Sequence, residues 1–353
     1  MFGVLSRPSK GLVGVDISST SVKLLKLSLK NDGYCLENYA VVPLIEGSII
    51  EKNIINAEAV VDAIKQAMKL IAVSRHDVAF ALPTSLVVTK TMEMDADVPD
   101  DEREVQIRLD AEQYIPFPLD ELILDFALVS NAKNLAHRVN ILLVATRIEN
   151  VETRRNVIEL AGLIPKVADV EMFAIENVLG TFTDLCPVDA GIIVILDIGH
   201  TTTTLSVLEQ YRTIYNREQV FGGKQLTDAI QQHYHLSFLE AEYLKKNASL
   251  PDDYRDEVLD PFLNLLIQHV QRALQFFFSS SAISDIDYIL LTGGCANIMG
   301  LTQWLQQELG YPVMMINPFL NMKLSRKISP QQLANDAPAL IVACGLALRS
   351  FDQ

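Results

Sequence analysis

Basic residues and paired cysteines are both scarce in this chain of 353 residues. Lysine and arginine number 29 against 44 acidic residues, so the formal net charge is −15, and no basic cluster interrupts the acidity. We expect such a chain to avoid nucleic acid and anionic lipid, because both present negative charge to a partner. The four cysteines stand singly, without a CxxC pair or metal-ligand spacing. This usage predicts reduced, packed thiols in a cytoplasmic protein rather than a disulfide framework.

Several motifs of membrane proteins and enzymes are missing as well. No apolar run approaches the roughly 18 residues that cross a bilayer, and the first ten residues, broken by Pro8, do not resemble a signal peptide. The phosphate loop GxxxxGK followed by Ser or Thr does not occur, and no order of serine, histidine and aspartate indicates a nucleophile. We therefore expect neither direct membrane insertion nor covalent catalysis.

What the chain does contain is one pattern that occurs twice. Residues 13–27 and 195–208 each read as an apolar strand, an Asp-Ile turn rich in hydroxyls and small residues, and a second apolar strand. Backbone N–H groups and hydroxyls of such a turn can converge on an anion, and the aspartate can hold Mg²⁺, usually through water. Either copy alone would most simply be an ordinary hairpin. Its repetition in both halves of the chain predicts a phosphate site.

The two hairpins supply most of the candidate binding residues. Asp16 and Asp197, at equivalent positions, are the candidate magnesium residues. Hydroxyls, a lysine and a glycine around them would contact phosphate. This set consists of Asp16, Ser18, Ser19, Thr20, Lys23, Asp197, Gly199, Thr201 and Thr202.

Two Gly-Gly turns extend this set. One follows a predicted strand and would let a flat ring or a phosphate approach the backbone. The other opens a predicted helix, whose unpaired N–H groups and dipole favour an anion. A lone Gly-Gly is weak evidence, because any tight strand-to-helix turn uses it. The candidates from these turns are Gly222, Gly223, Lys224, Gly293, Gly294 and Asn297.

Five further residues could take part in binding or chemistry. Glu242 and Lys245 share one helix face, an arrangement that is usually a solvated surface pair. Glu171 and His200 are the candidates to orient a water molecule, so any chemistry would be phosphoryl transfer to water. A kinase would instead need a carboxylate base beside an acceptor hydroxyl, and Asp169 or Glu171 stays open for that role.

Hydrophobic period and turn signals predict an α/β fold of two similar units. In the first half, a three-strand meander ends at residues 34–42, and a helix over 56–71 leads to a buried strand over 78–82. A meander over 192–220 starts the second half in the same way. Between them, residues 84–163 show a β-α-β-β-α order with two prolines after the first helix. That order predicts a small α+β insert, either a rigid connector or a partner contact.

Helix signals also mark the second half. Ser237 and Glu240 form a capping box. Residues 253–280 read as one long helix that Pro261 could kink, and residues 338–348 as a closing apolar helix.

This order resembles the actin-like ATPase fold of actin, Hsp70, sugar kinases and the cell-division protein FtsA. The Asp16 and Asp197 hairpins look like its two phosphate motifs, and the Thr292 Gly-Gly turn like its adenosine motif. The resemblance implies ATP and Mg²⁺ as cofactors, and two related domains with central mixed sheets flanked by helices, plus an FtsA-type insert. The expected division is 1–83 and 164–190 for the first actin-like domain with 337–353 packing back on it, 84–163 for the insert, and 191–336 for the second actin-like domain.

Within that fold, the chain resembles the PilM family of type IV pilus assembly. The resemblance implies a cytoplasmic ATP-binding scaffold, peripheral at the inner membrane, with at most weak ATPase activity. It also implies binding of the N-terminal cytoplasmic peptide of PilN beside the insert, with other pilus inner-membrane and motor components as further partners. Candidate peptide contacts are Arg108, Tyr114, Ile115 and Phe117. The resemblance is carried by residues 14–23, 114–118, 221–227, 240–245 and 317–322.

Alternatives from the same fold stay open. One is a kinase of a sugar or small acid, and another is an FtsA-like cell-division protein. FtsA is expected to end in an amphipathic membrane helix, which the segment before Gln353 does not resemble. A third alternative is a partner-binding protein whose two hairpins no longer bind nucleotide. Ser18 stands where the second copy has Gly199, and His200 adds a titratable ring, so both leave catalysis in doubt.

Overall fold

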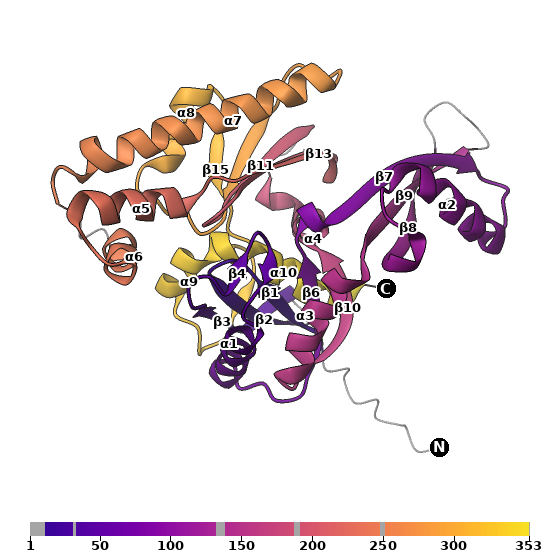
Figure 1. Cartoon of the computed structure of the whole chain (residues 1–353), viewed down its shortest axis with the longest axis horizontal. Coiled ribbons are helices and arrows are strands. Elements are labelled where there is room, and N and C mark those ends of the chain that lie inside the picture. The colour runs from indigo at the N-terminus through magenta and orange to yellow at the C-terminus, as the bar shows by residue number, and fades with distance from the viewer. Residues whose placement is uncertain (1–10, 31–32, 132–137, 187–190, 248–250, 353) are drawn as a thin grey trace.

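Two sheets form the body of the protein, and in both a three-strand meander is followed by two parallel strands; the first sheet has the additional edge strand β16. The computed structural model describes residues 11–30, 33–131, 138–186, 191–247 and 251–352. The first sheet has the order β10-β6-β1-β2-β3-β16 and the second β13-β12-β11-β14-β15 (Figure 1). In each, an antiparallel meander continues into parallel strands. The first sheet consists of β1 (Val13–Ile17), β2 (Ser21–Lys30), β3 (Gly33–Pro43), β6 (Asp77–Leu82), β10 (Ile164–Val170) and β16 (Lys323–Leu324). The second consists of β11 (Ile192–Ile198), β12 (Thr203–Glu209), β13 (Arg212–Gln219), β14 (Tyr288–Thr292) and β15 (Val313–Met315).

The first sheet is covered by helices on both faces, which explains why every residue of β1 is buried. On one face lies α1 (Ala57–Leu70), whose Asn56 side chain accepts a hydrogen bond from the N–H of Ala59 at 3.0 Å, as an N-cap does. Helix α3 (Ile148–Leu160) shares the hydrophobic core with α1 through Val157 and Ile158. The helix predicted over 56–71 is therefore present with nearly these bounds.

Two helices lie between the sheets and contact each other closely. They are α4 (Glu171–Thr181) and α10 (Ile341–Leu348), and the core around them contains residues of both sheets. A Cβ on Gly345 would lie 1.9 Å from the carbonyl oxygen of Ala174 in α4. A Cβ on Gly14 of β1 would lie 2.2 Å from the carbonyl oxygen of Ala343 in α10. Glycine is required at both positions, because the backbones of α4, α10 and β1 meet there.

The second sheet carries most of the remaining helices. The capping box of α6 is present: the N–H of Ser237 donates to Glu240 Oε2 at 2.9 Å, and the N–H of Glu240 to Ser237 Oγ at 3.4 Å. The helix expected over 253–280 begins instead with a π-helical segment, Arg255–Leu259, and Pro261 lies in the first turn of α7 rather than at a kink. The helices on the second sheet are α5 (Gly223–Tyr234), α6 (Phe238–Asn247), α7 (Asp260–Ser280) and α8 (Leu301–Leu309), whereas α9 (Pro330–Asp336) contributes Leu333 to the core between the two sheets.

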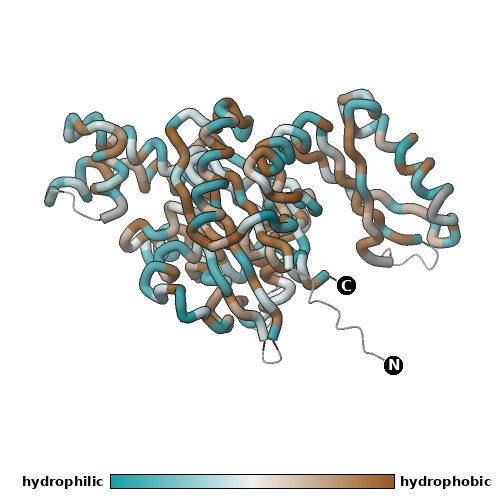
Figure 2. Tube along the Cα trace, turned by 90° about the horizontal axis from the view of Figure 1, so that it is seen from below, coloured by the Kyte–Doolittle hydropathy of each residue, from teal (hydrophilic) through white to brown (hydrophobic). Residues whose placement is uncertain are grey.

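The α+β insert projects from one side of the body (Figures 1 and 2). Its sheet has the order β7-β9-β8, and α2 packs on it around a separate small core that includes Met94, Ile107 and Leu143. Helix α3, expected within the insert, packs in the core of the first sheet instead. The division of the chain into domains stays a prediction. The insert's elements are α2 (Asp100–Tyr114), β7 (Val87–Asp95), β8 (Leu122–Asn131) and β9 (Arg138–Arg147).

A short hairpin that sequence patterns did not predict lies between β3 and α1. It consists of β4 (Ile49–Ile50) and β5 (Asn53–Ile54). Two-residue strands leave no hydrophobic period to detect. Among the described residues, no helix has the length and apolar character needed to span a membrane.

Candidate functional site

The Asp16 hairpin contains its own counterion. Lys23 lies opposite Asp16 in the β1–β2 register, and its Nζ donates to Asp16 Oδ2 at 2.7 Å. The two side chains are 10% and 6% exposed. Lys23 Nζ also donates to Ser18 Oγ at 3.2 Å, while the N–H of Ser18 donates to the carbonyl of Ser21 at 3.0 Å. The charge-assisted bond compensates the cost of burying both charges and fixes the shape of the turn.

The Asp197 hairpin has the same shape without the lysine. Thr204 lies opposite Asp197 on β12, and Thr292 lies opposite it on β14. Gly293 has a φ of +94°, and a Cβ there would lie 2.3 Å from Asp197 Oδ1, so only glycine fits beside this carboxylate. Burial raises the pKa of Asp197, and the cations that oppose this shift are Lys52 and Lys23 of the other half.

Lys52 is a functional candidate that the sequence did not reveal. It lies in the β4–β5 turn with a left-handed φ of 67°, and its Nζ is 3.3 Å from Glu218 Oε2 on β13 of the second sheet. Burial lowers the pKa of Lys52, but the carboxylates of Glu171, Glu218 and Asp197 more than reverse this effect. The Lys52 side chain therefore connects the two halves of the molecule across the space between the two hairpins.

Arg154 of α3 holds the backbone of this turn. Its side chain is 2% exposed, and Nη2 donates to the carbonyl of Lys52 at 2.7 Å. Its Nε has no hydrogen-bond partner among the described residues. Burial lowers the pKa of Arg154, while the carboxylates of Glu171 and Asp16 raise it. Arg154 thus adds positive charge behind the candidate site.

Glu171 begins α4 and faces the same group of charges. The N–H of Thr84 donates to Glu171 Oε2 at 3.4 Å, and the N–H of Met172 donates to Thr84 Oγ1 at 3.2 Å. Burial raises the pKa of Glu171, Lys52 lowers it, and Asp16 and Asp197 raise it further. The structure therefore brings both aspartates, Glu171 and Lys52 into one electrostatic cluster drawn from both sheets.

His200, the other candidate to orient a water molecule, lies near α5 and α6. Burial and the charge of Lys245 lower the pKa of His200, whose remaining charged neighbours belong to α5 and α6. Its ring meets Phe238 edge-on at a centroid distance of 6.1 Å. His200 and Glu171 therefore lie in different charge environments, and the structure does not pair them.

The start of α5 is already occupied by backbone carbonyls. The N–H groups of Gly223 and Lys224 donate to the carbonyls of Gly199 and His200 at 2.9 and 2.7 Å, and the N–H of Gly222 donates to the Gln225 side chain at 2.9 Å. The expectation that these N–H groups face a phosphate is wrong for this structure. The close backbone approach attaches α5 to the Asp197 hairpin, which explains the need for two small residues there.

Glu242 and Lys245 form a partly buried cluster rather than a solvated pair. Lys245 Nζ donates to Thr227 Oγ1 at 2.6 Å and forms an ion pair with Glu242. The two side chains are 13% and 16% exposed. Thr227 of α5 also donates to the carbonyl of Gly223 at 3.0 Å. This cluster joins α6 to the glycine turn of α5.

The remaining turn candidates lie at the ends of the same strands. Ser18, Ser19 and Thr20 are half-buried between β1 and β2, and Thr201 and Thr202 are half-buried between β11 and β12.

Gly294 and Asn297, the candidates that follow β14, have different surroundings. No atom lies within 4 Å of a Cβ placed on Gly294, so the turn is open there. Asn297 Nδ2 donates to the carbonyl of Asn335 at 2.5 Å and thereby joins this turn to α9.

Asp169, the open candidate for a kinase base, is engaged by the C-terminal helix. Arg349 Nε and Nη2 donate to its two oxygens at 2.6 and 3.1 Å, and the N–H of Val170 donates to Oδ1 at 2.8 Å. A carboxylate bound in this way is a poor general base, because proton acceptance would break a bidentate ion pair.

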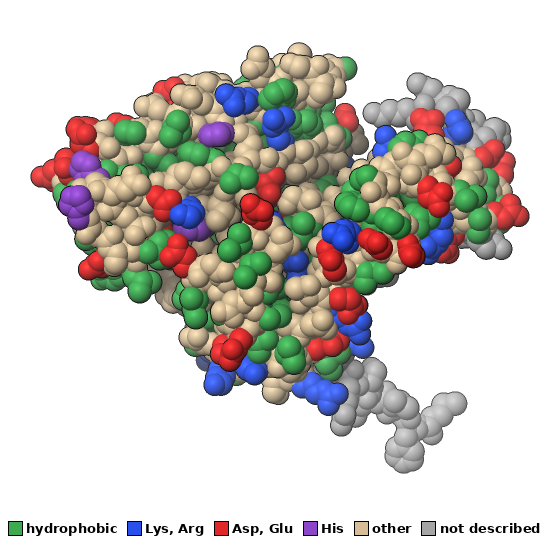
Figure 3. Space-filling model, viewed as in Figure 1, with side chains coloured by type: hydrophobic (Ala, Val, Ile, Leu, Met, Phe, Trp, Pro, Cys, Tyr) green, Lys and Arg blue, Asp and Glu red, His purple; other side chains and the backbone are tan. Residues whose placement is uncertain are grey.

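The insert presents most of its candidate peptide contacts at the surface. Arg108 lines a hollow of about 160 Å³ between α2 and β8. Tyr114 and Phe117 are 49% and 40% exposed, whereas Ile115 is 4% exposed and belongs to the insert's core. Figure 3 shows apolar side chains on the insert flanked by acidic and basic ones. The side chain of Ile115 can therefore support a contact surface but cannot line it.

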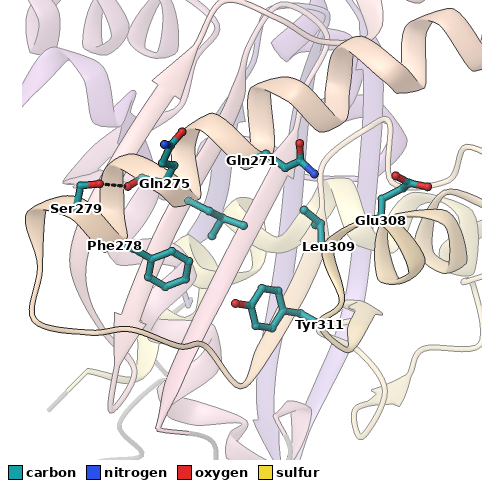
Figure 4. A pocket seen from close by; sticks show the side chains of 8 residues that line it. Gln271, Gln275, Phe278, Ser279, Glu308, Leu309 and Tyr311 are labelled. Carbon is teal, nitrogen blue, oxygen red and sulfur yellow. Dashed lines mark hydrogen bonds between the residues drawn. The ribbon is translucent and has the colours of Figure 1, made fainter.

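A second hollow lies far from these residues. It has a volume of about 420 Å³ and opens between α7 and α8, with Gln271, Phe278 and Tyr311 among its lining residues (Figure 4). None of the predicted site residues lines it. Among the described residues, no group of three or more His, Cys, Asp or Glu side chains is arranged to hold a metal ion by itself.

Comparisons with known proteins agree with this architecture. Residues 14–351 match the family model described as type IV pilus assembly protein PilM. A solved structure described as the PilM-PilN type IV pilus biogenesis complex is similar, with a TM-score of 0.83 and 28% identity over 98% of this chain and 100% of that chain.

More distant structures share the fold. The ethanolamine utilization protein EutJ from Carboxydothermus hydrogenoformans has a TM-score of 0.57 at 15% identity, covering 97% of this chain and 90% of that chain. An archaeal actin homolog in complex with ADP has a TM-score of 0.52 at 11% identity, covering 97% and 99%. The expected actin-like α/β fold is therefore confirmed.

Proposed function

The chain belongs to the PilM family of type IV pilus assembly proteins, and from this premise we propose that it is an ATP-binding scaffold of the pilus assembly complex. In this proposal, ATP with Mg²⁺ binds between the two hairpins, and a peptide of a PilN partner binds beside the insert. Hydrolysis, if any, is weak and secondary. The protein acts from the cytoplasmic side and reaches the inner membrane through its partners.

The electrostatic cluster of both sheets is the observation that carries the nucleotide proposal. Asp16, Asp197 and Glu171 act on one another, and burial raises the pKa of the latter two. Buried carboxylates that lie close together favour the binding of a hard divalent cation, which prefers oxygen ligands. Since no described group of side chains could hold a metal alone, these residues fit Mg²⁺ bound mainly by water and phosphate.

Each residue has a role in this arrangement. Mg²⁺ would neutralise phosphate charge, and Asp16 and Asp197 would hold its water ligands. The hydroxyls of both turns would donate to phosphate oxygens. Glu171, positioned by the N–H of Thr84, would accept a hydrogen bond from a water molecule near the terminal phosphate. Gly294, where the turn is open, would leave space for the adenosine side of the nucleotide.

The partner proposal rests on the similarity to a PilM-PilN complex at 28% identity over 98% of this chain. On the insert, Arg108 supplies a charge beside a hollow, and Tyr114 and Phe117 supply exposed aromatic surface. Lys90 lies 4.9 Å from the Tyr114 ring centroid and Arg147 lies 5.4 Å from that of Phe117, which positions both rings. We assign these three candidates to peptide contact and Ile115 to their support.

Thermal unfolding with and without nucleotide tests the first part. At an ATP concentration one hundred times the dissociation constant, binding stabilises the folded state by about 2.7 kcal/mol, which raises the midpoint by several degrees. The Asp16→Asn, Asp197→Asn double variant is the control and should lose this increase. An unchanged midpoint at millimolar Mg²⁺-ATP would refute nucleotide binding.

A titration with a synthetic PilN N-terminal peptide tests the second part. Phe117→Ala should weaken peptide binding by about tenfold, because buried aromatic anchors carry much of such an interface. Phe276→Ala, which removes an exposed aromatic side chain of α7, is the matched control and should leave peptide binding unchanged. Equal binding by the two variants would exclude Phe117 as a contact.

A further inference from the structure

Lys52 is the charged residue whose position the proposed function does not yet explain. We propose that Lys52 is a second phosphate-binding cation of the nucleotide site, paired with Glu218 until nucleotide takes its place. The inference rests on the proposed binding of ATP between the hairpins. It assigns a residue outside both repeated hairpins to that site and gives it an exchangeable partner.

The backbone around Lys52 is fixed, so its ammonium group has a defined starting point. Arg154 donates to the Lys52 carbonyl at 2.7 Å, and the N–H groups of Ile55 and Asn56 donate to the carbonyl of Ser48 at 2.9 and 3.1 Å. Ser48 Oγ in turn donates to the carbonyl of Ile45 at 2.6 Å. The turn is thus attached to α3 on one side and to the start of α1 on the other.

The partner of Lys52 lies in line with the second aspartate. In the register of the second sheet, Asp197 pairs with Thr204, and Thr204 pairs with Glu218. Neighbouring strands lie about 4.8 Å apart, so Glu218 is two strands, or about 10 Å, from Asp197 along the sheet. Lys52 therefore reaches from the first half of the molecule to the row of residues that contains Asp197.

The ion pair of Lys52 is looser than that of Lys23. Its Nζ–Oε2 distance is 3.3 Å, against 2.7 Å for Lys23 and Asp16, and charge-assisted N–H···O bonds are usually about 2.7–2.9 Å long. The Lys52 and Glu218 side chains are each 20% exposed, so water can reach both. Glu218 therefore holds Lys52 less tightly than Asp16 holds Lys23.

Charge balance explains why Lys52 would turn toward phosphate. Glu171, Glu218 and Asp197 all act on its ammonium group. A triphosphate entering between the hairpins would meet this negative charge and be repelled unless cations neutralise it. Lys52 can bind a phosphate oxygen and release Glu218, whose side chain already contacts solvent.

A double-mutant cycle with Mg²⁺-ATP tests the exchange. We expect Lys52→Met to weaken ATP binding by about tenfold to a hundredfold, since one charge-assisted hydrogen bond is lost. Glu218→Gln should strengthen ATP binding by about threefold, because it frees Lys52. In the Lys52→Met background, Glu218→Gln should have almost no effect. Lys30→Met, which removes a lysine from the exposed Lys30–Glu37 pair, should bind ATP like the unmodified protein.

The outcomes separate this inference from the proposed function. If the unmodified protein does not bind Mg²⁺-ATP, both are refuted. If it binds, but Lys52→Met binds within twofold of it, nucleotide binding stands and the role of Lys52 is refuted. An equal gain from Glu218→Gln with and without Lys52 would indicate long-range repulsion alone and would also refute the exchange. Because the two single variants should change affinity in opposite directions, a loss of folding cannot imitate the expected result.

Discussion

The Asp16 hairpin and the Asp197 hairpin have the same turn but differ in the residue opposite the aspartate. In the first hairpin this residue is Lys23, bonded to Asp16 at 2.7 Å. In the second it is Thr204, and the cations that act on Asp197 come from the other half of the molecule. The first hairpin is therefore electrostatically complete by itself, whereas the second depends on the halves being close together. A duplicated motif can thus make a site whose charge balance depends on contact between the two halves of the molecule.

The largest effect should come from removing the internal cation of the first hairpin. Lys23→Met leaves Asp16 buried without a partner, and breaking a buried ion pair in this way costs about 3–5 kcal/mol. Thr204→Val, at the equivalent position, should cost less than about 1 kcal/mol, because Thr204 is uncharged and its removal leaves no buried ion without a partner. Urea unfolding measures both. Similar losses from the two substitutions would mean that the hairpins do not differ in the way described.

A smaller difference should separate the two aspartates. Asp16→Asn leaves Lys23 with a weaker, neutral acceptor and should destabilise the fold by about 1–3 kcal/mol. Asp197→Asn removes a partly buried charge whose own hairpin lacks a cation, so the unfolding midpoint should stay the same or rise. Thermal unfolding without nucleotide gives the comparison. A greater loss from Asp197→Asn than from Asp16→Asn would contradict it.

The pH dependence of the protein's stability should be set mainly by the second hairpin, which contains Asp197. Burial raises the pKa of Asp197 and Glu171, so the folded protein holds more protons than the unfolded chain between their ordinary pKa of about 4 and the raised value. The stability that these groups contribute is fully present below the ordinary pKa and is lost as pH rises through the raised one. Midpoints measured in steps from pH 4 to pH 8 should therefore fall less for Asp197→Asn than for the unmodified protein. Parallel curves would exclude a raised pKa for Asp197.

The smallest effect should come from giving the second hairpin a cation. Thr204→Lys places a lysine opposite Asp197, as Lys23 stands opposite Asp16. We expect a gain in stability of less than about 1 kcal/mol, since the half-buried position keeps some solvent screening. The informative measurement is the slope of the midpoint with pH, which should become smaller. A steeper slope than in the unmodified protein would show that the new ammonium group does not reach Asp197.

The sequence predicted those parts of the fold that depend on local patterns. The first helix expected within residues 84–163 is present as α2, and it ends at Tyr114, just before the two prolines that mark its end in the sequence. The capping box at Ser237 and Glu240 was also visible, since both partners lie within four residues. The repeated Asp-Ile turn predicted the duplicated meander, and the shared strand order confirms it.

What the sequence could not predict depends on contacts between distant segments. Lys52 lies in the two-residue turn between β4 and β5. Its partner Glu218 is brought near by the packing of the two sheets. Lys245 looked like a surface residue because Thr227, which buries it, belongs to another helix. The N–H groups of Gly223 and Lys224 looked free because the carbonyls that bind them come from the Asp197 hairpin. The spacing of apolar residues along the chain contains no information on such pairs.

The contact between α4 and α10 has a mechanical consequence. At Gly345 the two helices touch through their backbones, and the same is true of α10 and β1 at Gly14. Helices usually resist sliding because their side chains interlock. At this crossing the backbones touch directly, so one sheet can tilt against the other without separating bulky side chains. The crossing can therefore serve as a pivot between the two sheets. Gly345→Ala would place a methyl group in that pivot, where it would meet the carbonyl oxygen of Ala174 and force the two helices apart.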